Sequence, residues 1–184
     1  VLLGSNITII GAGFDYEGLR GTTFYKKFDA NYLLGIPDGT DWTTIENIHF
    51  RSGYTGSAIW MYGRYNTVRK CLFSCFDGDV IRILNGTGGA EFNYENRIED
   101  NIMFAFEGHG IWIGSFHNYI LGNVINGHWT TNIYSCIYVT YGTWANMIYD
   151  NHVMSDGKCS GVTLWGSHVR VMRNWFDNNN DGLV

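Results

Sequence analysis

Proline is nearly absent from this sequence, with one in 184 residues, and only 16% of the residues are charged. No stretch is rich in Lys or Arg and the formal net charge is −5, so the chain lacks the basic surface that binds nucleic acid. No apolar run approaches the roughly 20 residues that cross a bilayer as a helix. We therefore expect neither nucleic acid nor a membrane as a partner.

The four cysteines lack the spacing of a metal site or a redox motif. They are Cys71, Cys75, Cys136 and Cys159, and they include no CxxC pair and no ligand-like spacing with His. We expect structural thiols, and we expect neither a metal ion nor a cofactor.

Glycine and aromatic residues are abundant instead. The chain has 24 Gly, together with 7 Trp, 12 Tyr and 11 Phe. Glycine suits tight turns because it adopts positive φ without strain. The rings are more than one small core needs, so we expect some of them on the surface, where flat aromatic faces suit sugars.

One pattern recurs along the chain: an aliphatic residue, a second inward-facing residue three positions later and a third five positions later. The first members of successive sets are 23, 30, 22, 28 and 23 residues apart. Repeats of this length are typical of solenoids, in which each repeat forms one coil. The sets are Ile45/Ile48/Phe50, Val68/Cys71/Phe73, Ile98/Asn101/Met103, Ile120/Asn123/Ile125, Ile148/Asn151/Val153 and Val171/Asn174/Phe176. Ile9/Ala12/Phe14 fits as an earlier coil, followed by a longer excursion.

A further short strand follows within each coil, at 58–61, 80–83, 110–113, 136–139 and 161–164. Side chains alternate between the two faces of a strand, so the second and fourth residues of each run should face inward and the third outward. Asparagines recur in register with the coils as well. Because an amide has donors and acceptors to pass along a column, we expect two ladders, Asn101/Asn123/Asn151/Asn174 and Asn66/Asn96/Asn118/Asn146.

These features predict an all-β fold, a right-handed parallel β-helix of about seven coils, with residues 1–184 forming a single domain. Solenoids normally need capping repeats, and neither end of this sequence reads as one. We therefore expect a fragment without caps from a longer chain.

The sequence resembles the pectate-lyase-like superfamily of right-handed β-helices. The resemblance is carried by the coil pattern, by residues 5–13 (SNITIIGAG) and by the segments 21–24 (GTTF) and 31–34 (NYLL), which look like the first coils of bacteriophage tailspike and depolymerase proteins. It implies a polysaccharide as partner, an extracellular or virion-tail location and a homotrimer. The fold alone hosts many activities, so it does not fix one.

The outward position of the later strand predicts a binding surface. Trp60, Arg82, Trp112 and Tyr138 occupy it in successive coils, so their side chains should form a stripe on which a glycan can lie. Rings would stack on sugar faces, and the Arg82 guanidinium would hold a carboxylate or hydroxyls. We add Lys158, from the corner before the last of these strands, to the substrate-binding candidates. The alternative is that the stripe packs against another subunit or loop.

The corner before that strand gathers candidate catalytic residues, with Asp77 aligned to Glu107 and Asp79 to His109. Carboxylates one coil apart would be separated by about 5 Å, as in a retaining glycosidase. The segment 108–110 (GHG) also resembles the Gly-His-Gly segment of polygalacturonases, which implies that His109 assists Asp77 or Asp79. Alternatively, acidic and His side chains at tight turns cap backbone amides.

Two functions remain open from the sequence. The first is a glycan-binding and glycan-cleaving β-helix, either a hydrolase or a lyase, from a tailspike or a secreted depolymerase. The second is a non-catalytic spike or adhesin segment whose purpose is stiffness and subunit contact.

Overall fold

The computed structural model describes residues 1–14, 21–85, 94–127, 135–155, 157, 159–177, 179 and 182–184. These residues form twenty β-strands, and none of them lies in a helix. The described part of the chain accordingly contains no helix of the length and hydrophobicity needed to span a membrane.

The strands form three parallel sheets. The first sheet contains β1 (Thr8–Ile10), β4 (Thr44–Glu46), β7 (Thr67–Arg69), β10 (Arg97–Glu99), β13 (Tyr119–Leu121), β16 (Met147–Tyr149) and β19 (Arg170–Met172). The second contains β2 (Thr23–Lys26), β5 (His49–Ser52), β8 (Leu72–Phe76), β11 (Ile102–Phe106), β14 (Val124–Asn126), β17 (His152–Met154) and β20 (Trp175–Asp177). The third contains β3 (Tyr32–Ile36), β6 (Ser57–Met61), β9 (Ile81–Ile83), β12 (Ile111–Ile113), β15 (Ser135–Val139) and β18 (Ser160–Leu164).

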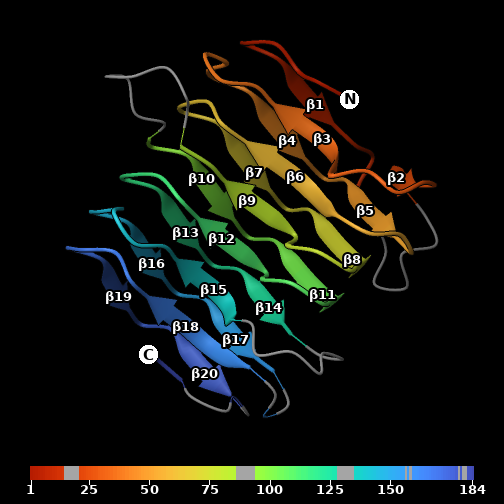
Figure 1. The fold of residues 1–184 in the computed structure, drawn as a ribbon. Helices are drawn as coiled ribbons and strands as arrows, with labels where there is room; N and C mark the ends of the chain where they lie inside the picture. The colour runs from red at the N-terminus through yellow and green to blue at the C-terminus, as the bar shows by residue number, and fades with distance from the viewer. Residues whose placement is uncertain are drawn as a thin grey trace.

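Each of the first six coils gives one strand to each sheet in turn, the last coil gives β19 and β20, and successive coils stack from the N-terminal to the C-terminal end (Figure 1). The predicted parallel β-helix is confirmed. The aliphatic column of the first sheet has the predicted register, Ile9–Ile45–Val68–Ile98–Ile120–Ile148–Val171. From Ile45 to Ile148 these side chains are fully buried, and burying each one contributes about 1.5–3 kcal/mol to folding.

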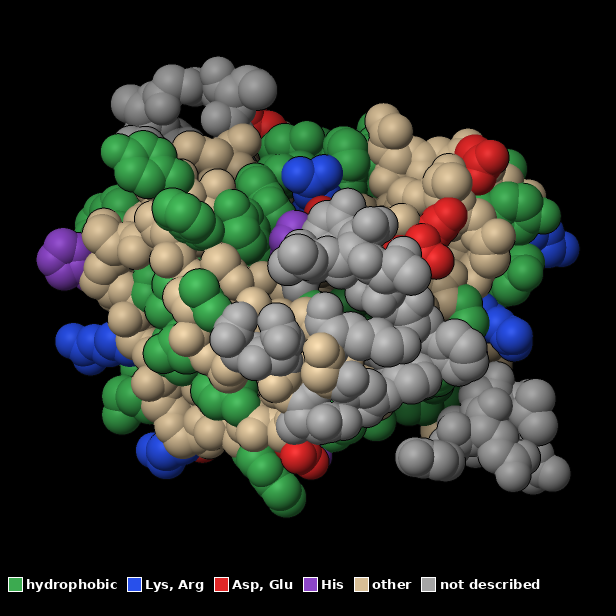
Figure 2. Space-filling model, turned by 60° about the horizontal axis from the view of Figure 1, so that its bottom comes forward, with side chains coloured by type: hydrophobic (Ala, Val, Ile, Leu, Met, Phe, Trp, Pro, Cys, Tyr) green, Lys and Arg blue, Asp and Glu red, His purple; other side chains and the backbone are tan. Residues whose placement is uncertain are grey.

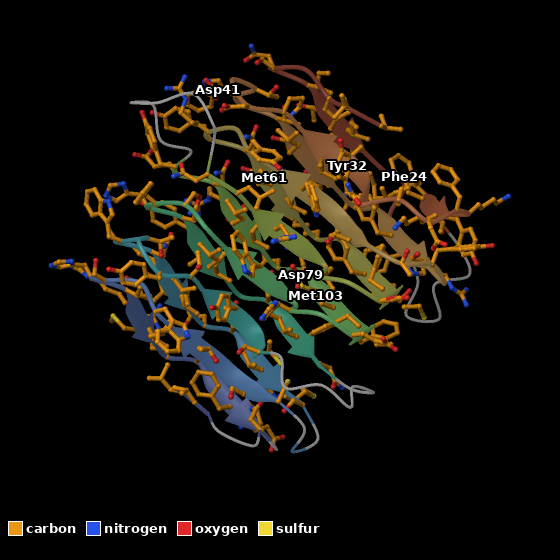
Figure 3. All side chains as sticks on the ribbon, viewed as in Figure 1. Phe24, Tyr32, Asp41, Met61, Asp79 and Met103 are labelled. Atoms are coloured by element: carbon orange, nitrogen blue, oxygen red, sulfur yellow. The ribbon has the colours of Figure 1, made fainter. Side chains whose placement is uncertain are left out.

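The prediction for the first coil was wrong at two positions. Ala12, expected to face inward, is exposed, and Thr22 takes the position opposite Ile48. Phe24, not Phe14, pairs with Phe50 in the second sheet, and the two rings meet edge to face with centroids 5.5 Å apart. Phe14 instead forms an isolated antiparallel bridge with Gly21. The excursion therefore begins inside the first coil, before β2, and Figure 3 shows Phe24 at the N-terminal end of the stack.

The third sheet alternates as predicted. Its inward positions are buried in Ile59/Met61, Ile81/Ile83, Ile111/Ile113 and Ile137/Val139, whereas in β18 Val162 is buried and Leu164 is only partly so. These side chains join those of the other two sheets in one continuous core. The outward positions are consequently held in a fixed line along the helix axis.

Both asparagine ladders are confirmed. Asn101 Nδ2 donates to Asn123 Oδ1 at 3.0 Å, and Asn123 Nδ2 donates to Asn151 Oδ1 at 2.9 Å. The second amide hydrogen of Asn123 goes to the carbonyl of Ile98 at 2.8 Å. The equivalent bonds join Asn66, Asn96, Asn118 and Asn146. Buried amides that satisfy one another in this way avoid the penalty of about 1–3 kcal/mol for each unpaired group.

Cys136 and Cys159 lie close together, with their sulfur atoms 3.7 Å apart, and both are unbridged thiols. They are buried in the core beside Gly127. Burial raises the pKa of the other buried thiol, Cys71, to about 12, so it stays protonated and packs as an apolar side chain.

Candidate functional site

The outward stripe of the third sheet has the predicted register. Trp60, Arg82, Trp112 and Tyr138 occupy paired positions on β6, β9, β12 and β15. All four side chains are half-buried. The stripe is fixed by the backbone because the core-facing neighbours on both sides of each residue are fully buried.

Arg82 lies between two indole rings. Its guanidinium carbon is 5.3 Å from the ring centroid of Trp60 and 4.7 Å from that of Trp112. Each cation–π contact is worth about 0.5–1 kcal/mol at an exposed site and more where water is excluded. Trp60 also packs against Tyr32, with ring centroids 5.0 Å apart. Its indole nitrogen has no hydrogen-bond acceptor among the described residues.

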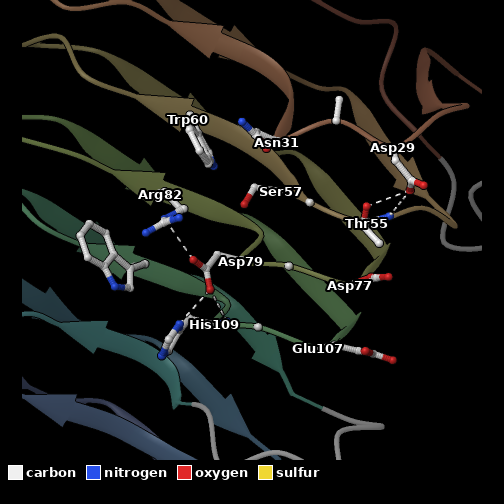
Figure 4. A pocket seen from close by; sticks show the side chains of 15 residues that line it. Asp29, Asn31, Thr55, Ser57, Trp60, Asp77, Asp79, Arg82, Glu107 and His109 are labelled. Carbon is white, nitrogen blue, oxygen red and sulfur yellow. Dashed lines mark hydrogen bonds and ion pairs between the residues drawn. The ribbon is translucent and has the colours of Figure 1, made fainter.

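At the corner before the third sheet, Asp79 joins Arg82 to His109 (Figure 4). Asp79 Oδ1 accepts hydrogen bonds from the His109 backbone N–H at 2.7 Å and from His109 Nδ1 at 2.8 Å. Its other oxygen, Oδ2, lies 3.1 Å from Arg82 Nε in an ion pair. Because the carboxylate can only accept, Nδ1 carries the hydrogen of this bond, and in the neutral imidazole the lone pair is then on Nε2.

The surroundings of Asp79 fix its charge. Burial favours the neutral acid, but the hydrogen bonds from the His109 side chain and backbone, with the charge of Arg82, outweigh it and lower the Asp79 pKa below its ordinary value. Asp79 therefore stays ionised at neutral pH. This carboxylate is suited to orienting His109 and Arg82, and it is not suited to donating a proton.

Asp77 and Glu107 have a different environment. The register of Phe76 with Phe106 places them on adjacent coils, and both side chains are exposed. Figure 4 shows both carboxyl groups pointing away from Arg82, toward the opposite side of the corner. In the described part of the chain neither carboxylate forms an ion pair. They are therefore available to a ligand, unlike Asp79.

A glycine at this corner in three successive coils, Gly56, Gly78 and Gly108, makes the close stacking possible. A Cβ at Gly108 would lie 2.5 Å from the backbone nitrogen of Asp79, and one at Gly78 would lie 2.8 Å from the carbonyl carbon of Gly56. Any larger residue would separate the coils where Asp79 meets His109. The three glycines form a column that positions the polar residues on either side of it.

These residues line one open cleft of about 690 Å³, which extends over the stripe from Trp60 to Trp112 and includes all four catalytic candidates. Asp77 and Glu107 stand on its rim, because they also line a smaller hollow of about 280 Å³ on their other side. Tyr138 does not line the cleft, although its ring centroid is 4.7 Å from that of His109. Lys158 lies outside the described residues.

The sequence interpretation missed the residues that the preceding coils bring to the cleft, namely Asp29, Asn31, Thr55 and Ser57. Alignment of Gly56 with Gly78 and Gly108 was a usable signal for Thr55 and Ser57, which flank Gly56. Asp29 was missed because the first coil had been aligned on Phe14. Its Oδ1 accepts hydrogen bonds from the backbone N–H of Thr55 at 3.0 Å and from Thr55 Oγ1 at 2.8 Å.

Lys26 supports this end of the cleft from within. Its side chain is among the largest that are fully buried, and its ammonium group donates to the carbonyls of Ala30 and Thr55. Burial lowers the Lys26 pKa, and the negative charges of Asp29 and Asp77 offset part of this shift by favouring the ammonium form. The ammonium therefore ties the two loops that form the rim.

Neither the cleft nor the rest of the described chain contains three His, Cys, Asp or Glu side chains placed to hold a metal ion. Figure 2 shows Lys and Arg side chains as isolated spots on the face it presents, among many hydrophobic side chains.

Comparison with known proteins gives one match, at the level of structure. No family model and no curated protein matches the sequence. Among solved structures, the chain is similar to the A-module of the Azotobacter vinelandii mannuronan C-5 epimerase AlgE6, with 12% sequence identity and a TM-score of 0.48. The superposition covers 95% of this chain and 62% of that one, so this chain spans less than two thirds of the protein it matches.

Proposed function

We propose that this chain binds a glycan along the cleft of the third sheet and cleaves it at the corner formed by Asp77, Asp79, Glu107 and His109. One observation carries the proposal: a guanidinium held between two indole rings lies in the same open cleft as a carboxylate–imidazole pair and two exposed carboxylates. Aromatic faces bind the apolar faces of sugar rings, and convergent polar groups in a cleft are the usual setting of a reaction.

Each residue has a distinct part in this proposal. Trp60 and Trp112 stack on sugar rings, and Arg82 donates hydrogen bonds to hydroxyl or acidic groups. Asp79 holds the tautomer of His109, which serves proton transfer. Asp77 and Glu107 supply the acid and base groups that cleavage of a glycosidic bond requires. Tyr138 supports the His109 ring from the neighbouring coil, and Lys158 is a further candidate for glycan binding.

The test is depolymerisation by the intact protein. We would screen capsular, O-antigen, storage and pectic polysaccharides, and then measure four variants, Asp77→Ala, Asp79→Ala, Glu107→Ala and His109→Ala. We expect at least a hundredfold loss of activity in one or more of them, because general acid–base groups typically contribute about 10²–10⁴-fold. Arg173→Ala, at an exposed ion pair remote from the cleft, is the control. Wild-type activity in all four variants would contradict the proposal.

The tailspike-like role, the homotrimer and the extracellular or virion location are further proposals, since they depend on the resemblance alone. Light scattering of the purified protein tests the trimer. The competing function, a non-catalytic spike segment, predicts that Trp60 and Trp112 become protected from solvent on assembly. Quenching of tryptophan fluorescence, compared below and above the assembly concentration, measures that protection.

A further inference from the structure

The cleft has an excess of negative charge among its described residues. Four carboxylates line it, those of Asp29, Asp77, Asp79 and Glu107, against a single guanidinium, that of Arg82. That guanidinium is already ion-paired with Asp79. The ammonium of Lys26 lies behind the rim and directs its hydrogen bonds to two backbone carbonyls. An incoming ligand therefore meets mainly carboxylate oxygens.

Two of these carboxylates are held in their charged form. Hydrogen bonds from the Thr55 hydroxyl and backbone N–H lower the pKa of Asp29, and those from His109 lower that of Asp79. Protonation cannot relieve the charge near neutral pH. A polymer with one acidic group per sugar would place further negative charge within a few ångströms of these side chains, and like charges this close, in a partly desolvated site, disfavour binding.

The hydrogen-bonding groups of the cleft also favour an uncharged ligand over an acidic one. A carboxylate only accepts, and the side chains of Asp77 and Glu107 are exposed and line the cleft at its rim. Sugar hydroxyls and N-acetyl N–H groups are donors, whereas a uronate carboxylate is another acceptor. The partners that satisfy these oxygens are therefore uncharged groups rich in O–H and N–H.

We propose that the glycan is a neutral one, built of hexose or N-acetylhexosamine units, and that the reaction is hydrolysis. This inference rests on the proposed function and narrows it, because β-elimination by a lyase needs a uronate carboxylate beside the proton that is removed. A neutral sugar offers no such proton.

The register of Phe76 with Phe106 places Asp77 and Glu107 one coil apart, and this offset favours hydrolysis with retention. Adjacent coils of a parallel sheet lie about 4.8 Å apart, which suits the separation of about 5–5.5 Å between the carboxyl groups of retaining enzymes. The step begins when one of the two carboxylates takes up a proton from solvent. This carboxylic acid then donates the proton to the glycosidic oxygen as the bond from that oxygen to the anomeric carbon breaks, and the other carboxylate bonds to that carbon. Water then displaces the carboxylate while the first residue, now a carboxylate, takes its proton.

Binding of matched oligosaccharides tests the charge argument. The probes are hexamers of mannose, glucose and N-acetylglucosamine, and as acidic counterparts hexamers of mannuronate and galacturonate. At low ionic strength we expect at least one neutral hexamer to bind about tenfold or more tightly than either uronate, with a smaller gap at high salt because screening weakens the repulsion.

Removing the charges of Asp77 and Glu107 tests directly whether they repel acidic glycans. Asp77→Asn/Glu107→Gln should strengthen uronate binding by about tenfold at low salt, because two repulsive charges are lost. The matched control is Asp100→Asn/Asp150→Asn, which removes two carboxylates from the turn between the first and second sheets, where the residues have a φ of 56° that Asn tolerates well. The control should leave both affinities unchanged.

The chemical structure of the products distinguishes hydrolysis from β-elimination. Hydrolysis in ¹⁸O-labelled water places one labelled oxygen at the new reducing end of each neutral product, and we expect this label. Preferred binding of the uronates, or products with unsaturated ends, would overturn this inference and leave the proposed function standing. A failure of every glycan, neutral or acidic, to bind would instead overturn the proposed function.

Discussion

The turn between the first and second sheets differs from the corner between the second and third sheets. At the turn, Asn101, Asn123, Asn151 and Asn174 repeat in successive coils and satisfy one another inside the protein. At the corner, the equivalent positions change from Thr55 to Asp77 to Glu107, and their side chains are exposed. Where the repeat is kept, polar groups stabilise the coil stack. Where it is broken, the carboxylates of Asp77 and Glu107 are left available for a ligand.

The first prediction tests whether the Asn ladder stabilises the coil stack, by interrupting it at its centre. Asn123→Ala removes the acceptor of the Asn101 backbone N–H and side chain and the donor to Ile98 and Asn151. We expect about 3 kcal/mol or more of destabilisation, because several buried groups lose their partners together. Urea unfolding monitored by tryptophan fluorescence measures it.

Asn174→Ala is the matched control at the half-buried end of the same ladder. It removes bonds of the same kind where water can replace them, so the loss should be about 1 kcal/mol. Glycan affinity of either folded variant should equal that of the wild type. Equal destabilisation at both positions would show that the ladder does not act through burial.

The turn has residues that repeat from coil to coil and the corner does not, and this difference explains how far the sequence can predict the structure. The Asn ladders, the aliphatic column and the outward stripe could be read because identical residue types recur at fixed intervals. The rim residues Asp29 and Asn31 could not, because aligning the first coil on Phe14 instead of Phe24 leaves the corner between β2 and β3 without its register with the later corners. Nor could the sequence show that Asp79 turns toward Arg82 and His109 while Asp77 points the other way, since both flank the same glycine.

The second prediction concerns Asp79, the residue of the corner that is most enclosed by partners. Asp79→Asn should cost about 2 kcal/mol at neutral pH, because the charge-assisted hydrogen bonds from His109 and the ion pair with Arg82 are lost. The folded-state pKa of Asp79 is lowered, so its contribution is complete above the ordinary value of 3.8 and disappears as pH falls below it. The difference between wild type and variant should therefore shrink in acid.

Unfolding curves collected from pH 7 down to the acid limit of stability check this dependence. Asp150→Asn removes a carboxylate whose ion pair with Arg173 is exposed, so its effect should be small throughout. A constant difference between wild type and Asp79→Asn across the acid range would refute the assignment of Asp79 as an ionised orienting group.

The smallest effect on stability, and the sharpest separation of stability from binding, is expected at Arg82. Arg82→Met keeps an unbranched apolar chain between Trp60 and Trp112 but removes two cation–π contacts and the ion pair with Asp79, so the free energy of unfolding should fall by about 1–2 kcal/mol. Affinity for a glycan that the wild type binds should fall about tenfold or more, because the donors of the stripe are lost. Arg173→Met should change neither quantity appreciably. Urea unfolding measures the change in stability, and calorimetric titration of the same samples measures the affinity. Unchanged glycan affinity in Arg82→Met would show that the glycan does not bind at the stripe.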